Sequence, residues 1–423
     1  MLYHSLTDRT VTRSFADAVV EGLAPDKGLY YPERIPSLPQ DFWLSDEDLN
    51  PWDLGAAMMA PLAEGALSHD ELLAMLKEVL NFSLDLHEIE DNVYALELFH
   101  GPTHAFKDVG ARFLSRVLRK VSDKRLTILV ATSGDTGSAV AQGFLNVPNI
   151  DVVILYPQGR ISHIQEQQLT TAGANIKALE VEGAFDDCQA MVKAAFLDAD
   201  LQAQRPLTSA NSINIARWMP QSIYYAWATY LMGQPAQFSV PSGNVGNLAA
   251  GVLAAQMGMP HAGFIAATNA NDGLASHLGG GAFQPRPSVA TLSNAMDVGN
   301  PSNLPRLQAL FGGDMAAMRA MVKGAKLDDA GTMKVMKEVL DRTGYVMCPH
   351  TAVGYAVLRE HRNPDVPGVV LATAHPAKFG EVVERATGHT PDMPDHLAEC
   401  LNKTKEATVI APHYEALKAH LLG

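Results

Sequence analysis

The chain has 423 residues, which suggests two or three domains at roughly 100–200 residues per domain. Hydrophobic residues make up 47% of it and charged residues only 18%, so it can bury large cores beneath a lightly charged surface. Its 32 Lys and Arg residues against 46 Asp and Glu residues give a net charge of −14, which repels nucleic acids and acidic membranes. We therefore expect neither a nucleic-acid-binding protein nor a membrane protein.

The cysteine content indicates a reducing compartment. Cys188, Cys348 and Cys400 are far apart and odd in number, so they form neither a disulfide framework nor a metal-binding spacing. The first residues lack the basic and apolar regions of a secretory signal, and no apolar run approaches the roughly 18 residues of a membrane helix. We expect a cytoplasmic protein with buried, reduced thiols.

The first 85 residues differ from the rest of the chain. A turn-rich patch at 25–32 is followed by further prolines up to Pro51. A helical pattern then covers 68–80, where Ser68 and Glu71 have the spacing of a capping box. We interpret residues 1–85 as a small N-terminal domain.

From about residue 94, apolar strands alternate with helices. Strands are predicted at 126–131, 151–156, 176–181, 237–241, 263–268 and 368–373, and helices at 138–145, 161–172 and 414–422. Uniformly apolar strands that alternate with helices predict an α/β fold with parallel sheets covered on both faces. In such folds, ligands bind at the loops that follow the carboxyl ends of the strands.

The first such loop, 132–138, has the sequence TSGDTGS and opens a helix. Its small residues allow close backbone approach, and free amides at a helix N-terminus favour an anion. An ordinary helix-capping turn uses the same residue types, so this loop alone leaves both interpretations open.

The second loop, 242–247, has the sequence SGNVGN and again joins a strand to a helix. Two glycines and two asparagines suit positive φ angles and amides aimed at one point, so a phosphate is the expected guest. A capping turn remains the alternative. Neither loop has the Lys-Ser/Thr ending of a nucleotide P-loop or the full dinucleotide pattern, which disfavours nucleotide binding.

Lys107 lies in the segment 99–108, FHGPTHAFKD. A lysine in apolar surroundings has a lowered pKa and can attack a carbonyl to form a Schiff base, although a single lysine is more often a surface residue. His100 and His104 are four residues apart, but Gly101 and Pro102 oppose the helix that would align them, so we expect no metal site. A reactive lysine together with a phosphate-binding loop is what pyridoxal phosphate requires.

Six ordered segments resemble the threonine synthase family, pyridoxal-phosphate enzymes of fold type II (tryptophan synthase β-like). They are 100–108, 132–138, 211–217, 242–247, 300–303 and 373–379. The N-terminal stretch is similar to the extra domain of the longer bacterial and fungal branch. The resemblance implies two three-layer α/β domains with mostly parallel sheets, at 86–220 and 221–423, beside the N-terminal domain 1–85.

The resemblance also implies the cofactor's ligands. Lys107 would hold pyridoxal 5′-phosphate as a Schiff base and then act as the proton-transferring base. Thr373 would face the pyridine nitrogen. The cofactor phosphate would bind the backbone amides of Gly243, Asn244, Val245, Gly246 and Asn247.

For the substrate, the resemblance implies two anion sites. The substrate carboxylate would lie against Ser133, Gly134, Asp135 and Thr136, where an acid at Asp135 is awkward unless it is protonated or turned away. The substrate phosphate would bind Asn211 and Arg217, with Lys378 as a second cation. His104 stands where we expect leucine.

The implied reaction converts O-phospho-L-homoserine and water to L-threonine and phosphate. One alternative is a threonine or serine dehydratase of the same fold, which would share Lys107 and the phosphate loop but has no use for a second anion site. Another is a non-catalytic relative that binds the cofactor or a phosphorylated metabolite. The sequence does not reveal the oligomeric state, which could be a monomer or a homodimer.

Overall fold

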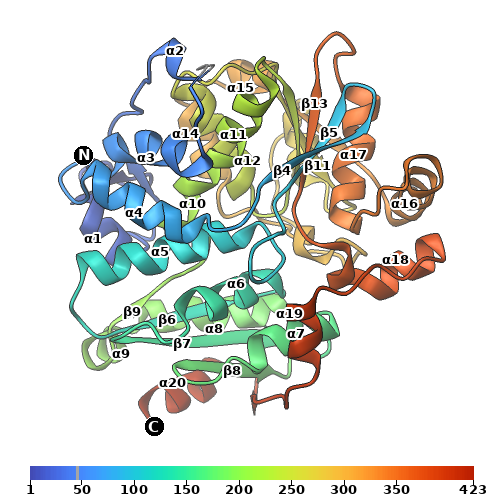
Figure 1. Cartoon of the computed structure of the whole chain (residues 1–423). Coiled ribbons are helices and arrows are strands. Elements are labelled where there is room, and N and C mark those ends of the chain that lie inside the picture. Colours follow the sequence, from blue (N-terminus) through green and yellow to red (C-terminus); the bar gives the residue numbers. More distant parts are fainter. Residues whose placement is uncertain (44–46) are drawn as a thin grey trace.

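The computed structural model describes residues 1–43 and 47–423. The N-terminal part contains a small antiparallel sheet in the order β2-β1-β3 (Figure 1). Its strands are β1 (Leu2–Ser5), β2 (Thr12–Ser14) and β3 (Tyr30–Pro32), and its helices are α1 (Phe15–Glu21), α2 (Gln40–Trp43), α3 (Pro51–Leu62) and α4 (His69–Val79). The predicted capping box of α4 is confirmed, because Ser68 Oγ accepts the Glu71 amide and the Glu71 carboxylate accepts the Ser68 amide.

The largest sheet has six strands in the order β12-β11-β10-β13-β5-β4, and only the edge strand β4 is antiparallel to its neighbour. The strands are β4 (Asp85–Glu90), β5 (Val93–Glu97), β10 (Gln237–Pro241), β11 (Phe264–Thr268), β12 (Val322–Lys326) and β13 (Gly368–Ala372). The associated helices are α11 (Ser222–Met232), α12 (Gly246–Gln256), α13 (Gly273–Leu278), α14 (Leu304–Leu310), α15 (Met315–Met321), α16 (Asp329–Thr343), α17 (Pro349–His361) and α18 (Gly380–Thr387).

The third sheet has five parallel strands in the order β14-β8-β7-β6-β9. The strands are β6 (Leu126–Ala131), β7 (Ile150–Pro157), β8 (Ile176–Val181), β9 (Leu207–Thr208) and β14 (Thr408–Ile410). The associated helices are α5 (Lys107–Val121), α6 (Asp135–Phe144), α7 (His163–Thr170), α8 (Phe185–Leu197), α9 (Ala199–Gln204), α19 (Asp395–Leu401) and α20 (Tyr414–Leu422). The two larger sheets confirm the predicted α/β fold with mostly parallel strands.

Sheet membership does not follow the expected division at residue 220. Strand β5 pairs with β13, so residues 85–97 belong to the same sheet as residues 237–372. Strand β14 pairs with β8, which returns residues 408–410 to the sheet built mostly from 126–208. The chain therefore crosses between the two sheets near both ends, and an alternation of elements along a sequence does not specify such long-range pairing.

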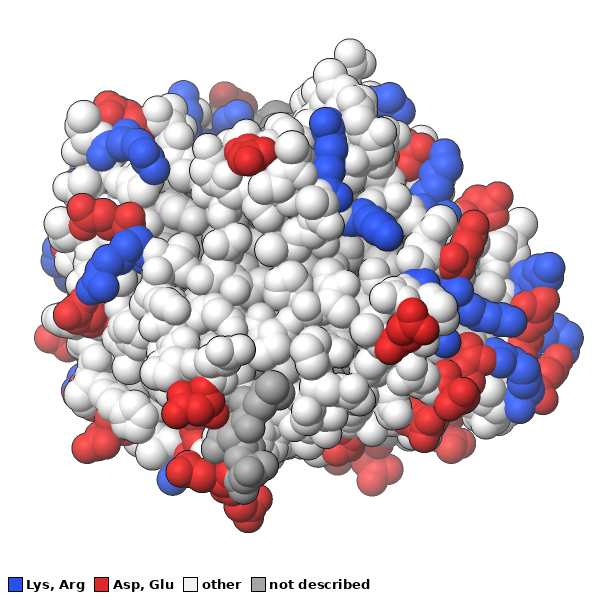
Figure 2. Space-filling view, turned by 90° about the horizontal axis from the view of Figure 1, so that it is seen from above, with Lys and Arg blue, Asp and Glu red and all other residues white. Residues whose placement is uncertain are grey.

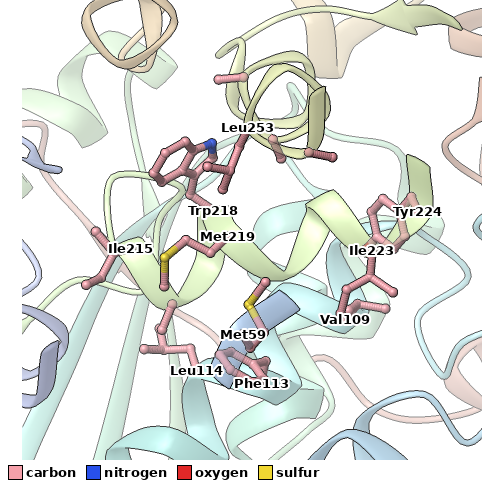
Figure 3. Packing of buried hydrophobic residues seen from close by; sticks show 14 of the residues in the cluster. Met59, Val109, Phe113, Leu114, Ile215, Trp218, Met219, Ile223, Tyr224 and Leu253 are labelled. Atoms are coloured by element: carbon pink, nitrogen blue, oxygen red, sulfur yellow. The ribbon is translucent and has the colours of Figure 1, made fainter. Parts of the chain in front are cut away.

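The N-terminal part is packed tightly against the rest of the molecule. Met59 of α3 lies beside Phe113 of α5 (Figure 3). The same buried cluster includes Leu114 of α5, Trp218 at the end of the short helix α10 (Ile215–Trp218), and Met219, which follows that helix. All five side chains are buried. Burying one such side chain contributes about 1.5–3 kcal/mol, so this cluster firmly fixes the helices that carry Lys107 and Arg217.

The surface agrees with the low charged fraction of the sequence. The face in Figure 2 is largely uncharged at its centre, and Lys, Arg, Asp and Glu gather toward its edges. The three cysteines are free and buried, as predicted. No helix in the described parts of the chain is long and apolar enough to cross a membrane.

Candidate active site

A narrow cavity of about 80 Å³ lies beyond the carboxyl ends of strands from both larger sheets. It collects residues that follow β6, β9, β10 and β13, which is where ligands bind in parallel sheets. The lining residues are Phe106, Lys107, Asp135, Thr136, Ser212, Arg217, Gln221, Pro241, Ser242, Gly243, Asn244, Val245, Gly246, Asn247, Leu248, Ala295, Met296, His350 and Thr373.

Four helices begin at or beside this cavity. Lys107 is the first residue of α5, Asp135 of α6 and Gly246 of α12, and His350 is the second residue of α17. The amides of a first helical turn lack intrahelical partners, and the helix dipole adds partial positive charge there. The cavity therefore attracts anions although the whole chain is acidic.

Lys107 fits the role of a nucleophile. Burial lowers its pKa to about 8, an effect that the nearby charge of Asp135 opposes and that of Arg217 reinforces. Its segment is held to the sheet, since the Phe106 amide donates to the Thr373 carbonyl at 2.9 Å and Tyr224 Oη donates to the Phe106 carbonyl. A substantial share of a free Lys107 amine is thus neutral near pH 8 and can attack an aldehyde.

The loop 243–247 curves around one end of the cavity and contains a hydrogen-bond donor that has no acceptor among the described residues. Val245 has a φ of 65°, a left-handed conformation that is costly for a β-branched residue and is found mostly at functional sites. Asn244 is held by Ser302, whose Oγ donates to Asn244 Oδ1 at 3.2 Å, and by Asn303, whose amide donates to its carbonyl at 3.1 Å. The buried Nδ2 of Asn247 has no partner among residues 1–43 and 47–423, so it can donate to a ligand oxygen.

These residues fit pyridoxal 5′-phosphate. Lys107, Thr373 and the loop 243–247 line one cavity, which places a nucleophile, a hydroxyl and a phosphate cradle around one space. A buried donor left unpaired is costly, so the free Nδ2 of Asn247 favours an acceptor such as a phosphate oxygen.

Arg217 offers a second anion site in the same cavity. Its Nη1 donates to the Ala210 carbonyl, and its buried Nε has no hydrogen-bond partner in the part of the chain that the structure describes. Burial lowers the pKa of Arg217 to about 10, so the group stays protonated at neutral pH. Asn211 does not line the cavity, because its Nδ2 donates to the Ala131 carbonyl at 3.2 Å, and Ser212 lines it instead.

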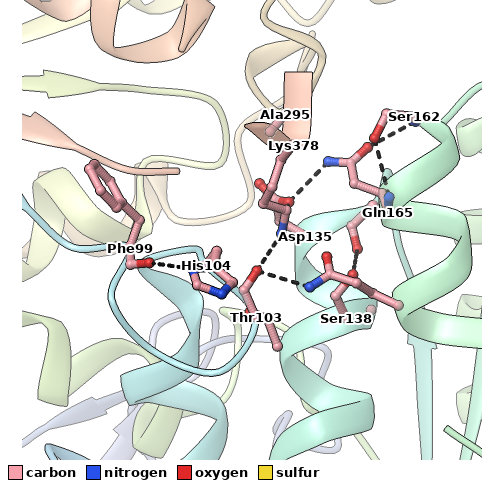
Figure 4. A network of polar contacts seen from close by, with 12 residues as sticks. Phe99, Thr103, His104, Asp135, Ser138, Ser162, Gln165, Ala295 and Lys378 are labelled. Carbon is pink, nitrogen blue, oxygen red and sulfur yellow. Dashed lines mark hydrogen bonds and ion pairs between the residues drawn. The ribbon is translucent and has the colours of Figure 1, made fainter. Parts of the chain in front are cut away.

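The loop expected to hold the substrate carboxylate is only partly exposed to the cavity. Asp135 and Thr136 line it, whereas Ser133 and Gly134 do not. Gly134 has a φ of 128°, and a Cβ built there would lie 2.3 Å from Cδ of Gln165. The Gln165 side chain therefore covers this glycine, and its Nε2 donates to Asp135 Oδ1 at 3.0 Å (Figure 4).

Asp135 forms a buried ion pair with Lys378, whose Nζ lies 2.8 Å from Asp135 Oδ1 (Figure 4). The same Nζ donates to the Thr103 carbonyl at 2.8 Å. Burial works to raise the pKa of Asp135, but the charges of Lys378 and Lys107 outweigh it and hold this pKa well below its usual range. Asp135 is therefore ionised, and Lys378 neutralises it instead of lying in the cavity beside Arg217 as the sequence suggested.

Several lining residues escaped the sequence analysis, among them Phe106, Ser212, Gln221, Met296 and His350. His350 Nε2 accepts the Ala295 amide at 3.2 Å, and burial lowers the pKa of His350 to about 4, so the ring is neutral. The available signal was a histidine directly after the proline that opens a predicted helical stretch. His104, by contrast, packs against His375 and does not line the cavity.

His100 does not pair with His104. Its Nε2 lies 2.7 Å from Glu97 Oε2 and 3.5 Å from Asp85 Oδ2. Glu97 and His100 line a second cavity of about 390 Å³, together with His375.

The fold and the cavity define a pyridoxal-phosphate-dependent enzyme, and the family model of that description matches residues 78–373. Models described as threonine synthase N terminus and threonine synthase, C-terminal match residues 2–79 and 351–421. The chain belongs to the threonine synthase family.

Individual relatives agree over nearly the whole chain. The threonine synthase of Escherichia coli is 43% identical over 408 residues, 94% of each chain. Its crystal structure matches with a TM-score of 0.95 and covers 100% of this chain and 99% of that one. A pyridoxal-phosphate-bound threonine synthase from Brucella melitensis is 35% identical, with a TM-score of 0.92, and covers 100% of this chain and 98% of that one.

Proposed function

We propose that this enzyme converts O-phospho-L-homoserine and water to L-threonine and phosphate. The observation that carries the proposal is the buried guanidinium of Arg217, which has no acidic partner among the described residues and lines the same cavity as Lys107 and the phosphate cradle. One anion site suffices for the cofactor, so a second one indicates a substrate that brings its own phosphate. A dehydratase has no group to place there.

Pyridoxal 5′-phosphate, when bound, withdraws electrons from the substrate and so makes its Cα proton acidic. Gly243, Asn244, Val245, Gly246 and Asn247 are proposed to hold its phosphate through backbone amides and the Asn247 side chain. Thr373 is proposed to face its ring nitrogen. A hydroxyl, unlike a carboxylate, does not force that nitrogen to be protonated, and milder electron withdrawal suits elimination and replacement.

Lys107 is proposed to move the proton at the substrate Cα. A base works best when its pKa lies near the working pH, and burial brings the pKa of Lys107 to about 8. The N-terminus of α5 and the anchored Phe106 backbone keep the amine at the cavity wall. Arg217 is proposed to hold the γ-phosphate until it leaves, with Asn211 orienting the adjoining backbone.

Around the substrate carboxylate, Ser133, Gly134 and Thr136 are proposed to offer hydroxyls and amides. Asp135 is turned toward Lys378, so its charge is neutralised and does not repel the carboxylate. The Gln165 side chain must then shift from Gly134 when the carboxylate binds. We place the reaction in the cytoplasm, where the three free cysteines stay reduced.

The test measures phosphate release and L-threonine formation from O-phospho-L-homoserine by the purified protein. L-Homoserine, which lacks the phosphate, is the matched control and should give no threonine. Lys107→Ala should abolish turnover and the absorbance band of the covalently held cofactor. Deamination of L-threonine without phosphate release from O-phospho-L-homoserine would refute the proposal in favour of a dehydratase.

A further inference from the structure

Arg306 of α14 is a fully buried cation that has no acidic partner among the described residues. The residue is 0% exposed, and its guanidinium carbon lies 4.9 Å from the ring centre of Trp218. No carboxylate within the described ranges forms an ion pair with it. A buried charge that nothing neutralises is costly, so an uncompensated guanidinium needs another source of negative charge.

Its hydrogen bonds reach two segments around the cavity and the N-terminal sheet. Nη1 donates to the Ser212 carbonyl at 2.9 Å and to Asn303 Oδ1 at 2.8 Å. Nε and Nη2 donate to the Tyr30 carbonyl at 3.2 and 3.1 Å, and Nη2 also donates to the Ile213 carbonyl. All of these acceptors are neutral, so they satisfy the donors without cancelling the charge.

Ser212 and Asn303 both touch the phosphate loop. Asn303 Nδ2 donates to Ser212 Oγ at 2.9 Å, and the Asn303 amide donates to the Asn244 carbonyl at 3.1 Å. A Cβ built on Gly246 would lie 3.3 Å from Asn303 Nδ2 and from Ser212 Cβ. Arg306 therefore lies one layer of residues behind the loop.

Arg306 also supports the segment that carries Arg217, the second anion site. Ser212 lines the cavity, and Arg217 follows it by five residues in the segment that Arg306 holds through two carbonyls. Asn214 ties this segment to the N-terminal part as well, because its Nδ2 donates to the Val19 carbonyl at 2.9 Å. The N-terminal sheet thus supports the backbone around both phosphates.

We propose that Arg306 is a positioning residue whose buried positive charge, clamped by the N-terminal sheet, stabilises the dianionic phosphates bound in front of it. The inference rests on the proposed role of residues 243–247 as the phosphate loop. It gives the N-terminal part an indirect share in phosphate binding, because the Tyr30 carbonyl holds the guanidinium of Arg306 in place.

The test compares Arg306→Met, which removes the charge, with Arg306→Lys, which keeps it. Arg112→Met is the matched control, because Arg112 is also buried, bonds neutral acceptors on Glu78 and Asn81, and stacks on Phe82. The full-length chain is freed of cofactor, and each variant is titrated with pyridoxal 5′-phosphate and, separately, with inorganic phosphate.

Arg306→Met should weaken both affinities by about 10- to 100-fold, because it removes a buried positive charge that lies one layer of residues behind the phosphates. Arg306→Lys should stay within about fivefold of the parent, and Arg112→Met should bind both ligands normally even if it melts earlier. In the parent, the ³¹P signal of the bound cofactor should not change with pH near the free phosphate pKa of about 6, because the phosphate stays dianionic. In Arg306→Met the pKa of the bound phosphate should rise, so the signal should change with pH in this range. A purely structural role would not produce that change.

Three results overturn the inference: Arg306→Met binding like Arg112→Met, Arg306→Lys losing as much affinity as Arg306→Met, or an unchanged ³¹P profile. If Arg306→Met does not fold, Arg306→Gln takes its place as the uncharged variant. In that case a tenfold loss of phosphate affinity in Arg306→Lys, which keeps the charge, is by itself enough to overturn the inference. Asn247→Asp separates the two proposals, because it keeps the acceptor for Tyr225 Oη while adding a negative charge to the loop. If Asn247→Asp binds phosphate normally, residues 243–247 are not the phosphate loop. If Asn247→Asp loses phosphate binding but Arg306→Met binds normally, the loop assignment stands and only the proposed role of Arg306 is wrong.

Discussion

The buried pair between Asp135 and Lys378 allows a quantitative test of how the substrate loop is held. Asp135→Asn leaves the Lys378 ammonium without a counter-charge, and Lys378→Met leaves the carboxylate of Asp135 alone. Both side chains are almost completely buried and their charged atoms lie 2.8 Å apart. Removing one partner of such a pair costs about 3–5 kcal/mol, because the other charge stays buried and unpaired.

That cost translates into a measurable melting shift. At about 2.1 cal/mol/K per residue, unfolding of a chain of this length as one unit has an entropy near 0.9 kcal/mol/K, so each single variant should melt about 3–6 °C lower. Differential scanning calorimetry of the holoenzyme measures this. Lys418→Met is the control, because Lys418 pairs with Asp198 at a partly exposed site where water screens the two charges, so this variant should melt close to the parent.

The double variant Asp135→Asn/Lys378→Met supplies the refutation. Because it leaves no isolated buried charge, it should be more stable than the sum of the single effects by about 2 kcal/mol. Additive effects within about 0.5 kcal/mol, or single shifts below about 1 °C, would show that the pair does not act as a unit. The pKa of Asp135 is depressed in the folded state, so its contribution to stability is present above the unfolded pKa of about 3.9 and is lost as the pH falls from there toward the folded pKa. The stability differences between the variants and the parent should therefore be constant from about pH 5 to 8.

Three further changes have defined outcomes. Arg217→Met should raise KM for O-phospho-L-homoserine by about 100-fold or more, measured by phosphate release, whereas an unchanged KM would place the substrate phosphate elsewhere. Met59→Ala should lower the free energy of unfolding by about 2–5 kcal/mol in a denaturant titration, and a loss below about 1 kcal/mol would contradict the tight packing seen in Figure 3. Hydrogen bonding to Glu97 raises the pKa of His100, so this pair stabilises the fold below about pH 6.5 and the contribution is lost as pH rises through the folded pKa. Glu97→Gln should remove that pH dependence from the melting temperature, and a profile that keeps it would point to another group.

Much of the local structure could be predicted from the sequence. The strands β8 and β10 and the helix α20 have the predicted bounds, and β6 does as well. These elements carry uniform apolar runs or a clear amphipathic period, and their ends are marked by nearby turn residues. The helix after β6 begins at Asp135, three residues before the predicted start, because the small residues of the loop already adopt helical geometry there.

The site shows the same division between local and distant information. Lys107, the loop 243–247 and Thr373 could be recognised from the sequence because each lies within a short segment of characteristic composition, and all of them line the cavity. Their neighbours His350 and Met296 could not, since a single histidine or methionine has no local pattern that distinguishes it from core.

The sequence by itself determined the class of fold, the helix and strand segments and the residue types needed for lysine and phosphate chemistry, because these depend on neighbours within about ten positions. Only the tertiary structure decided which strands share a sheet and how the net charge of −14 is organised. It pairs Lys378 with Asp135 across 243 positions of the chain and buries Arg306 against Tyr30 across 276. A charge becomes a ligand, a counter-ion or an uncompensated cation only through the groups packed around it, and those groups come from distant parts of the chain.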